Sequence, residues 1–265
     1  MSSPTATFKD LHQPSNPVIL ANTWDAPSLR AVLSLNTPAS SPVKAVATAS
    51  WAIADSLGIK DEELTLEQNL SRLAELAPIA RDAGIPISAD LQDGYGDRIV
   101  EAVVNAYGIG AAGANIEDAK PDGTLYPLDE QVRRLKEALA KVPADFTLNA
   151  RCDVFHQDPP PADGDEAAMA EAVRRGKAYL EAGATTVFYW GGARGLRTSE
   201  VERLVRELEG RVAVKLRAVE GEMSAKELGE LGVARISVGP ELYRLAMRAV
   251  RDGAERLLGG GTLTG

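Results

Sequence analysis

The chain has 265 residues and a formal net charge of −9 at pH 7, and 45% of its residues are hydrophobic but only 5% aromatic. This length suits one α/β barrel, with a core built mainly from aliphatic and alanine side chains. The acidic balance and the lack of a basic cluster argue against nucleic acid or an anionic membrane surface as partners. No apolar run reaches the length of a membrane span.

The compartment is predicted from two features. Cys152 is the single cysteine, which rules out an internal disulfide and suits a reducing environment. Residues 1–10 contain one lysine and no apolar core, so no signal peptide is expected. We therefore expect a cytoplasmic protein.

Eight apolar runs of strand length alternate with stretches of helical spacing. The runs are residues 17–24, 43–50, 85–91, 113–117, 146–152, 185–190, 212–216 and 234–238. Helical patterns between them include residues 64–83, 131–142 and 165–182, and further helices are expected after the Ser/Thr signals at 198–199 and 224. Gly84, Gly183 and Gly232 follow helical patterns, where a left-handed residue is favoured.

Strands that are apolar on both faces and alternate with helices indicate a parallel sheet covered by helices. A closed (β/α)8 TIM-type barrel fits this length best. An open doubly wound sheet is the alternative, although no Gly-x-Gly-x-x-Gly follows the first strand. Residues 158–164 are expected to form a stiff loop and residues 258–261 to begin a short flexible C-terminal tail. We expect residues 1–265 to form a single domain.

Polar strings follow three of the predicted strands: residues 89–96 (ADLQDGYG), 115–118 (NIED) and 149–153 (NARCD). Charged groups at such positions are costly to desolvate without a partner. In a barrel, the C-terminal ends of the strands carry the chemistry, so these groups are expected to converge. Carboxylates with one arginine suit a hard divalent cation that holds a carboxylate-bearing ligand. Helix caps or satisfied ion pairs are the structural alternative for each residue.

Candidate site residues are therefore those at or just after the C-terminal ends of the predicted strands. They are Trp24, Asp25, Thr48, Ala49, Ser50, Asp90, Gln92, Glu117, Arg151 and Asp153. Asp90 and Gln92 are expected to share one side of an extended segment, with Asp93 turned away. The oxygen donors favour Mg2+, with Mn2+ as an alternative, over zinc. His12 and His156 are the only histidines, so a three-histidine site is impossible.

Five strings in order resemble the isocitrate lyase/phosphoenolpyruvate mutase superfamily. They are residues 22–25 (NTWD), 47–50 (ATAS), 90–96 (DLQDGYG), 116–118 (IED) and 150–153 (ARCD), and the likeness runs from about Phe8 to Val250. The resemblance implies a magnesium-dependent enzyme that makes or breaks C–C or P–C bonds next to a 2-oxo acid.

The resemblance also implies roles for residues. Asp90 would contact the metal directly, whereas Asp61 and Glu117 would hold it through water. Arg151 would take the substrate carboxylate, and backbone amides around Ala49 and Ser50 would help to hold the oxo acid, in a substrate site that also includes Trp24 and Asp25. Gln92 replaces the second carboxylate of the family's Asp-x-Asp, which weakens metal binding, although an amide can still orient a metal-bound water.

The chain departs from the family at residues 119–126 (AKPDGTLY), where lyases carry Lys-Lys-Cys-Gly-His and phosphonate enzymes carry Lys-x-Asn-Ser. Isocitrate or methylisocitrate cleavage by the usual route is therefore not expected. Lys120 and Thr124 could substitute, but an exposed turn is favoured. Cys152 is expected in the core rather than as a nucleophile. Lys215 could form a Schiff base, but a structural ion pair is favoured.

Three functions stay open. The leading one is a magnesium-dependent lyase or decarboxylase that acts on a small 2-oxo (di)carboxylic acid such as oxaloacetate, through an enolate-like intermediate. A phosphonopyruvate hydrolase or mutase is the enzymatic alternative, and a 2-oxo acid binding protein with vestigial activity is the other.

Residues 241–258 carry an apolar stripe at helical spacing, which fits either the eighth barrel helix or a subunit contact. The resemblance implies a helix that crosses to a neighbouring subunit, but Gly259, Gly260 and Gly261 break any continuation. We therefore expect a homodimer or homotetramer that is held by barrel-helix packing rather than by a long exchanged arm.

Overall fold

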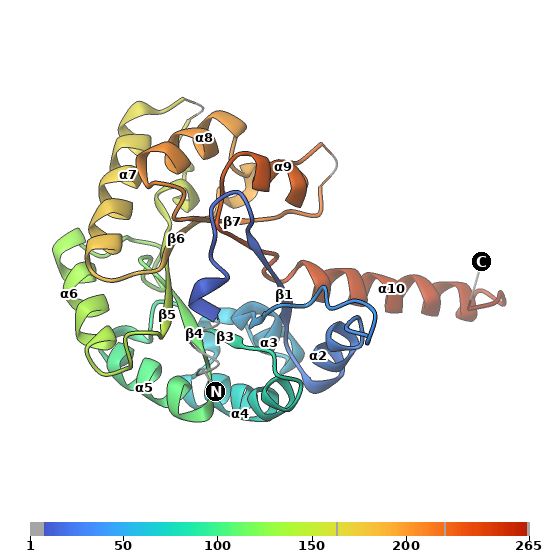
Figure 1. The fold of residues 1–265 in the computed structure, drawn as a ribbon. Coiled ribbons are helices and arrows are strands. Elements are labelled where there is room, and N and C mark those ends of the chain that lie inside the picture. Colours follow the sequence, from blue (N-terminus) through green and yellow to red (C-terminus); the bar gives the residue numbers. More distant parts are fainter. Residues whose placement is uncertain (1–7, 163, 220, 264–265) are drawn as a thin grey trace.

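The computed structural model describes residues 8–162, 164–219 and 221–263. Eight parallel strands close into a barrel in the order β1 to β8, with β1 paired to β8, and helices surround it (Figure 1). This confirms the predicted (β/α)8 TIM-type barrel. The expectation of no signal peptide falls mainly on residues 1–7, which lie outside the described residues.

All eight predicted strands are present. They are β1 (Val18–Thr23), β2 (Val46–Thr48), β3 (Ile87–Asp90), β4 (Gly113–Glu117), β5 (Thr147–Cys152), β6 (Thr186–Tyr189), β7 (Val212–Lys215) and β8 (Arg235–Ser237). The α-helices are α2 (Ala26–Leu33), α3 (Ser50–Ser56), α4 (Leu66–Asp82), α5 (Ile99–Ile109), α6 (Leu128–Leu139), α7 (Glu166–Glu181), α8 (Thr198–Glu207), α9 (Ala225–Glu230) and α10 (Glu241–Leu258). Short 3-10 turns are η1 (Asp61–Glu63), η2 (Gly96–Arg98), η3 (Val154–His156) and η4 (Gly192–Arg194).

Helix boundaries differ from the sequence prediction where capping decided them. Helix α6 begins directly after Pro127, three residues earlier than its apolar spacing indicated. Helix α8 begins at Thr198 itself, and Glu200 accepts the backbone N–H of Arg197, so no Ser or Thr caps it. Ser224 caps α9 as predicted, because its hydroxyl accepts the N–H of Glu227.

The barrel interior is polar along one row. Asp90, Asn115, Asn149 and Thr186 occupy matched register positions on β3 to β6. Outside this row, apolar side chains of the strands pack against the helices in one large core cluster that includes Cys152, as predicted. Fully buried Phe8 packs with Leu20 and other small apolar residues in a separate cluster. Most apolar packing therefore lies between the strands and the helices, whereas the polar row and the Phe8 cluster are separate from it.

Helix α10 follows β8 and extends away from the barrel (Figure 1). Tyr243 is its one buried side chain among the described residues. Apolar side chains farther along are exposed, at 45% for Leu245, 65% for Val250 and 54% for Leu257. The predicted apolar stripe is thus real, but the chain itself leaves much of it uncovered. Within the described residues, no helix combines the length and apolar character needed to span a bilayer.

Candidate active site

A cavity of about 1230 Å³ opens at the C-terminal ends of the strands. Its lining includes most of the predicted site residues: Ala49, Ser50, Asp61, Asp90, Gln92, Glu117 and Arg151. The parallel strands all end at this side of the barrel, so barrel closure brings together residues that are up to a hundred positions apart. Trp24 and Asp25 are absent from the described lining.

Asp90 is fixed by neighbours on both sides. Its Oδ2 accepts the backbone N–H of Ser50 at 3.0 Å, and its Oδ1 accepts the Asn115 amide at 3.3 Å. Its own backbone N–H donates to the Thr48 hydroxyl at 2.8 Å. Because the carboxylate is held in one orientation, it can present its remaining lone pairs to a cation.

A chain of side-chain hydrogen bonds runs along the polar row to Asp90. Thr186 donates to Asn149 Oδ1 at 2.7 Å, and Asn149 Nδ2 donates to Asn115 Oδ1 at 2.8 Å. An ionised carboxylate only accepts hydrogen bonds, so Asn115 must turn its NH2 group towards Asp90. That requirement fixes the orientation of the Asn115 and Asn149 amides and makes the Thr186 hydroxyl a donor.

Gln92 does not continue the β3 strand, so the prediction that it shares an extended segment with Asp90 is wrong. Strand β3 ends at Asp90, and Gln92 has a left-handed φ of 51°. Its side-chain amide instead donates to the Asp61 carbonyl at 2.7 Å and to Asp61 Oδ1 at 2.9 Å. Gln92 therefore holds Asp61 in place.

Asp93 was predicted to turn away, but it also lines the cavity, and its carboxylate is taken up by hydrogen bonds at the cavity edge. It accepts the Tyr126 hydroxyl at 2.7 Å and the backbone N–H groups of Tyr95 and Gly96. This organises the turn at residues 94–96, in which Gly94 has a φ of 88° and a Cβ would meet Ile99 at 2.7 Å. Only glycine suits Gly94.

Arg151 lies between two carboxylates. Its Nη1 is 2.5 Å from Glu117 Oε2, and its Nε donates to Asp153 Oδ1 at 2.8 Å. Burial raises the pKa of the Glu117 carboxyl well above its usual range, and Arg151 opposes this rise. The guanidinium is thus oriented by its partners, with 15% of the side chain exposed.

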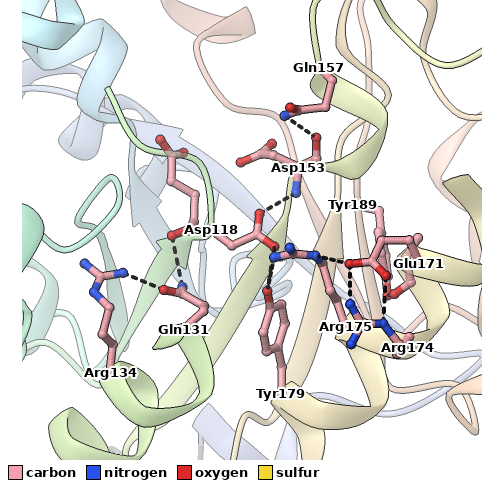
Figure 2. Close-up of polar contacts among 12 residues, drawn as sticks. Asp118, Gln131, Arg134, Asp153, Gln157, Glu171, Arg174, Arg175, Tyr179 and Tyr189 are labelled. Carbon is pink, nitrogen blue, oxygen red and sulfur yellow. Dashed lines mark hydrogen bonds and ion pairs between the residues drawn. The ribbon is translucent and has the colours of Figure 1, made fainter. Parts of the chain in front are cut away.

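Figure 2 shows Asp118, with Arg175 and Tyr179 of α7 pointing to it. Asp118 Oδ2 accepts from Arg175 Nη1 at 3.0 Å and from the Tyr179 hydroxyl at 2.5 Å, while Oδ1 accepts the backbone N–H of Asp153 at 2.8 Å. Asp118 is fully buried. It therefore ties the end of β5, which carries Arg151, to helix α7.

The acidic groups repel one another. Burial and then the charge of Asp90 raise the pKa of Asp61 to about 6, and Asp90 and Asp61 both contribute to the raised pKa of Glu117. A cation would relieve this repulsion. No three described His, Cys, Asp or Glu side chains gather closely enough to ligate one ion together. The donor set fits an ion that binds one carboxylate directly and the others through water, as Mg2+ commonly does.

Several predicted residues have other roles in the structure. Asp25 caps α2 by accepting the Ser28 N–H at 2.8 Å, and Trp24 packs against Tyr243 with ring centroids 5.1 Å apart. The Ser50 N–H, predicted to hold the oxo acid, already donates to Asp90. Lys215 Nζ is 3.2 Å from Glu241 Oε1, as the ion-pair interpretation predicted.

Residues 119–126, which differ from the motifs of the resembling family, form a short turn at the cavity edge. Ala119 and Leu125 form an isolated antiparallel bridge, and Lys120 lies 5.0 Å from the centre of the Tyr126 ring. Thr124 donates its hydroxyl to Asp122 at 2.6 Å. Residues 121–124 are exposed, as the turn interpretation predicted, but Lys120 and Thr124 also line the cavity, so the prediction that they could substitute for the family's loop stays open.

The sequence analysis did not identify Trp190, His156 and Arg244, which also line the cavity. Trp190 directly follows β6, so the strand-end rule could have found it. His156 stacks on Trp190 with ring centroids 4.0 Å apart. Arg244 lies on α10, and no local pattern in the sequence places that helix at the cavity.

Comparisons with known proteins identify the family of this chain. The family model for phosphoenolpyruvate phosphomutase matches residues 8–258. An uncharacterized protein of Mycobacterium tuberculosis is 29% identical over 261 residues, which cover 94% of this chain and 90% of that protein. Phosphonopyruvate hydrolase of Variovorax sp. strain Pal2 is 27% identical over 201 residues, covering 69% of this chain and 64% of that enzyme.

Among solved structures, a Burkholderia cenocepacia J2315 protein provisionally named a phosphonomutase has a TM-score of 0.83 and 31% identity, over 96% of this chain and 100% of that one. The family match spans the whole barrel, including the acidic strand ends and Arg151. The chain therefore belongs to the phosphoenolpyruvate phosphomutase family.

Proposed function

We propose that this protein is a magnesium-dependent lyase or decarboxylase that acts on a small 2-oxo acid of the oxaloacetate type. The observation that carries the proposal is the convergence of Asp90, Asp61 and Glu117 beside Arg151 at one cavity wall. Asp90 would hold Mg2+, or Mn2+, directly, and Asp61, Gln92 and Glu117 would orient its water ligands. When bound there, the ion would act as a Lewis acid that polarises the 2-oxo group and favours an enolate-like state.

The chain's own residues bind and orient the substrate. Arg151 offers a planar guanidinium, which matches a carboxylate by two parallel hydrogen bonds. Asp153 keeps that guanidinium aimed through its 2.8 Å bond to Nε. The Arg151 and Glu117 side chains are only 15% and 21% exposed, so limited contact with water strengthens their charge interactions.

Hydrolysis or rearrangement of a phosphonopyruvate-type substrate is the second candidate. It is favoured by the phosphoenolpyruvate phosphomutase family match and by the similarity to phosphonopyruvate hydrolase. The lyase reaction and the phosphonopyruvate reaction would use the same metal and the same contacts to the 2-oxo acid, so the assay must compare substrates.

The test is turnover of oxaloacetate and of phosphonopyruvate with Mg2+, together with calorimetry of Mg2+ binding. Asp90→Ala is expected to abolish metal-dependent turnover and Mg2+ binding while the fold persists by circular dichroism. Unchanged Mg2+ affinity in this variant would refute the proposed site. Binding of pyruvate without turnover of either acid would leave the vestigial binding protein as the function.

A further inference from the structure

A second cationic region lies on the cavity wall formed by β7 and α10. Lys215 at the end of β7 and Arg244 on α10 both line the cavity. Glu241 Oε1 is 3.2 Å from Lys215 Nζ and 3.3 Å from Arg244 Nη1. One carboxylate therefore serves two cations, and this trio keeps a net positive charge.

Trp190 connects this region to Arg151. The Arg151 guanidinium lies 5.0 Å from the centre of the Trp190 ring, and Lys215 Nζ lies 4.5 Å from the same centre. Both cations thus lie beside the same ring and line the same cavity. Burial, and then the charges of Arg151 and Lys215, lower the pKa of His156 to about 4, so this neighbour is neutral at neutral pH.

The two cations differ in how well they are balanced. Arg151 lies between Glu117 and Asp153, whereas Glu241, the one carboxylate paired with Lys215 among the described residues, is shared with Arg244. The Lys215 side chain is only 8% exposed, so little water solvates its ammonium group. An anionic ligand group at Lys215 would balance the positive charge that Glu241 alone does not neutralise.

The backbone leaves room for this ammonium. Gly239 has a left-handed φ of 54°, and a Cβ built there would lie 3.3 Å from Lys215 Cε and 3.7 Å from its Nζ. A side chain at this position would be strained and would crowd Lys215. Gly239 therefore leaves space for the Lys215 side chain at the cavity wall.

We propose that Lys215, assisted by Arg244, binds the second anionic group of the substrate and so selects 2-oxo acids that carry a carboxylate or a phosphonate at the far end. The proposal rests on the function above, in which Arg151 and the metal site take the 2-oxo acid end. Lys215 is then a specificity-determining residue, because an acid with one anionic group, such as pyruvate, gains nothing from it.

The test compares ligands that differ by one charged group. Binding of pyruvate, oxaloacetate and phosphonopyruvate is measured with Mg2+ by rapid-mixing tryptophan fluorescence, which reports binding before turnover. The wild type is expected to bind at least one dianionic acid more tightly than pyruvate, and the better of the two identifies the far group as carboxylate or phosphonate. Lys215→Met is expected to reduce that preference roughly tenfold, the scale of one lost charge-assisted hydrogen bond, and to leave pyruvate affinity unchanged.

Two further variants separate specificity from general effects. Lys215→Arg keeps the charge and is expected to retain the preference. Lys226→Met removes the same charge from an 85% exposed surface position and is expected to change nothing. A wild type that binds pyruvate and the dianionic acids equally, or a Lys215→Met variant that weakens all three alike, would overturn the proposal. Failure of the wild type to bind pyruvate with Mg2+ would instead contradict the proposed function itself.

Discussion

Replacement of Asp118 by alanine is expected to destabilise the protein strongly, because it leaves a buried arginine with less compensation. Asp118 is fully buried and accepts hydrogen bonds from Arg175, Tyr179 and the backbone N–H of Asp153. The Arg175 side chain is 7% exposed and would keep the Glu171 carboxylate at 2.8 Å and the neutral Tyr179 hydroxyl at 3.2 Å.

The magnitude follows from these contacts. Breaking a buried ion pair by removing one partner costs about 3–5 kcal/mol, and the remaining Glu171 contact favours the lower end, about 3 kcal/mol. Total stability of a domain is about 5–15 kcal/mol, so this is a large fraction of it. For a chain of this size, the loss lowers Tm by roughly 6–12 °C.

The assay is urea and thermal unfolding of Asp118→Ala, with two comparisons. Asp82→Ala removes a carboxylate that is 78% exposed and is expected to change the unfolding free energy by less than about 0.5 kcal/mol. Asp118→Asn keeps the side-chain volume and one acceptor oxygen, so its loss should lie between the two. A loss below about 1 kcal/mol for Asp118→Ala would refute the argument, because buried charge compensation would then contribute little here.

Two further predictions concern pH and assembly. Burial and then Arg235 lower the pKa of His12 from 6.5 to about 3, so its contribution to stability is complete above pH 6.5 and is lost as the pH falls towards 3. Between pH 7.5 and 5, the wild type should lose about 2 kcal/mol more than His12→Asn, measured by urea unfolding at both pH values; equal losses would contradict the shift. For assembly, we propose that a second copy of this chain packs against the exposed apolar side chains of α10 in a homodimer or homotetramer. Light scattering should then show a smaller species for Val250→Glu and no change for truncation after Leu258, whereas a monomeric wild type would disprove the assembly.

Local signals were sufficient to predict much of the fold. The eight apolar runs were recognisable as strands because most are buried on both faces, although Ile19 of β1 is 50% exposed. Gly84, Gly183 and Gly232 marked helix ends because each has a positive φ. The alternation of these elements determined the barrel class. Boundaries failed where a single residue decided them, as at Pro127 before α6.

The sequence also predicted which strand ends bring charged groups to the cavity, because a charged group at the end of a buried strand requires a partner or a ligand. Asp90, Glu117 and Arg151 were found in this way. The rule did not distinguish a helix cap from a site residue, so Asp25 was included although its carboxylate accepts the Ser28 N–H. Local sequence thus shows that a charged group needs a partner, but it does not show which residue or ligand that partner is.

Only the tertiary structure decided which groups meet. The left-handed conformation of Gln92 directs its amide to Asp61, and closure of the barrel brings Arg151 and Lys215 beside the same Trp190 ring from strands β5 and β7. Helix α10 adds Glu241 and Arg244 from beyond the last strand. Such contacts depend on chain closure over long sequence separations, whereas propensity and periodicity act only between near neighbours. The sequence therefore determined the elements and the reactive groups, and the closed barrel determined their pairing.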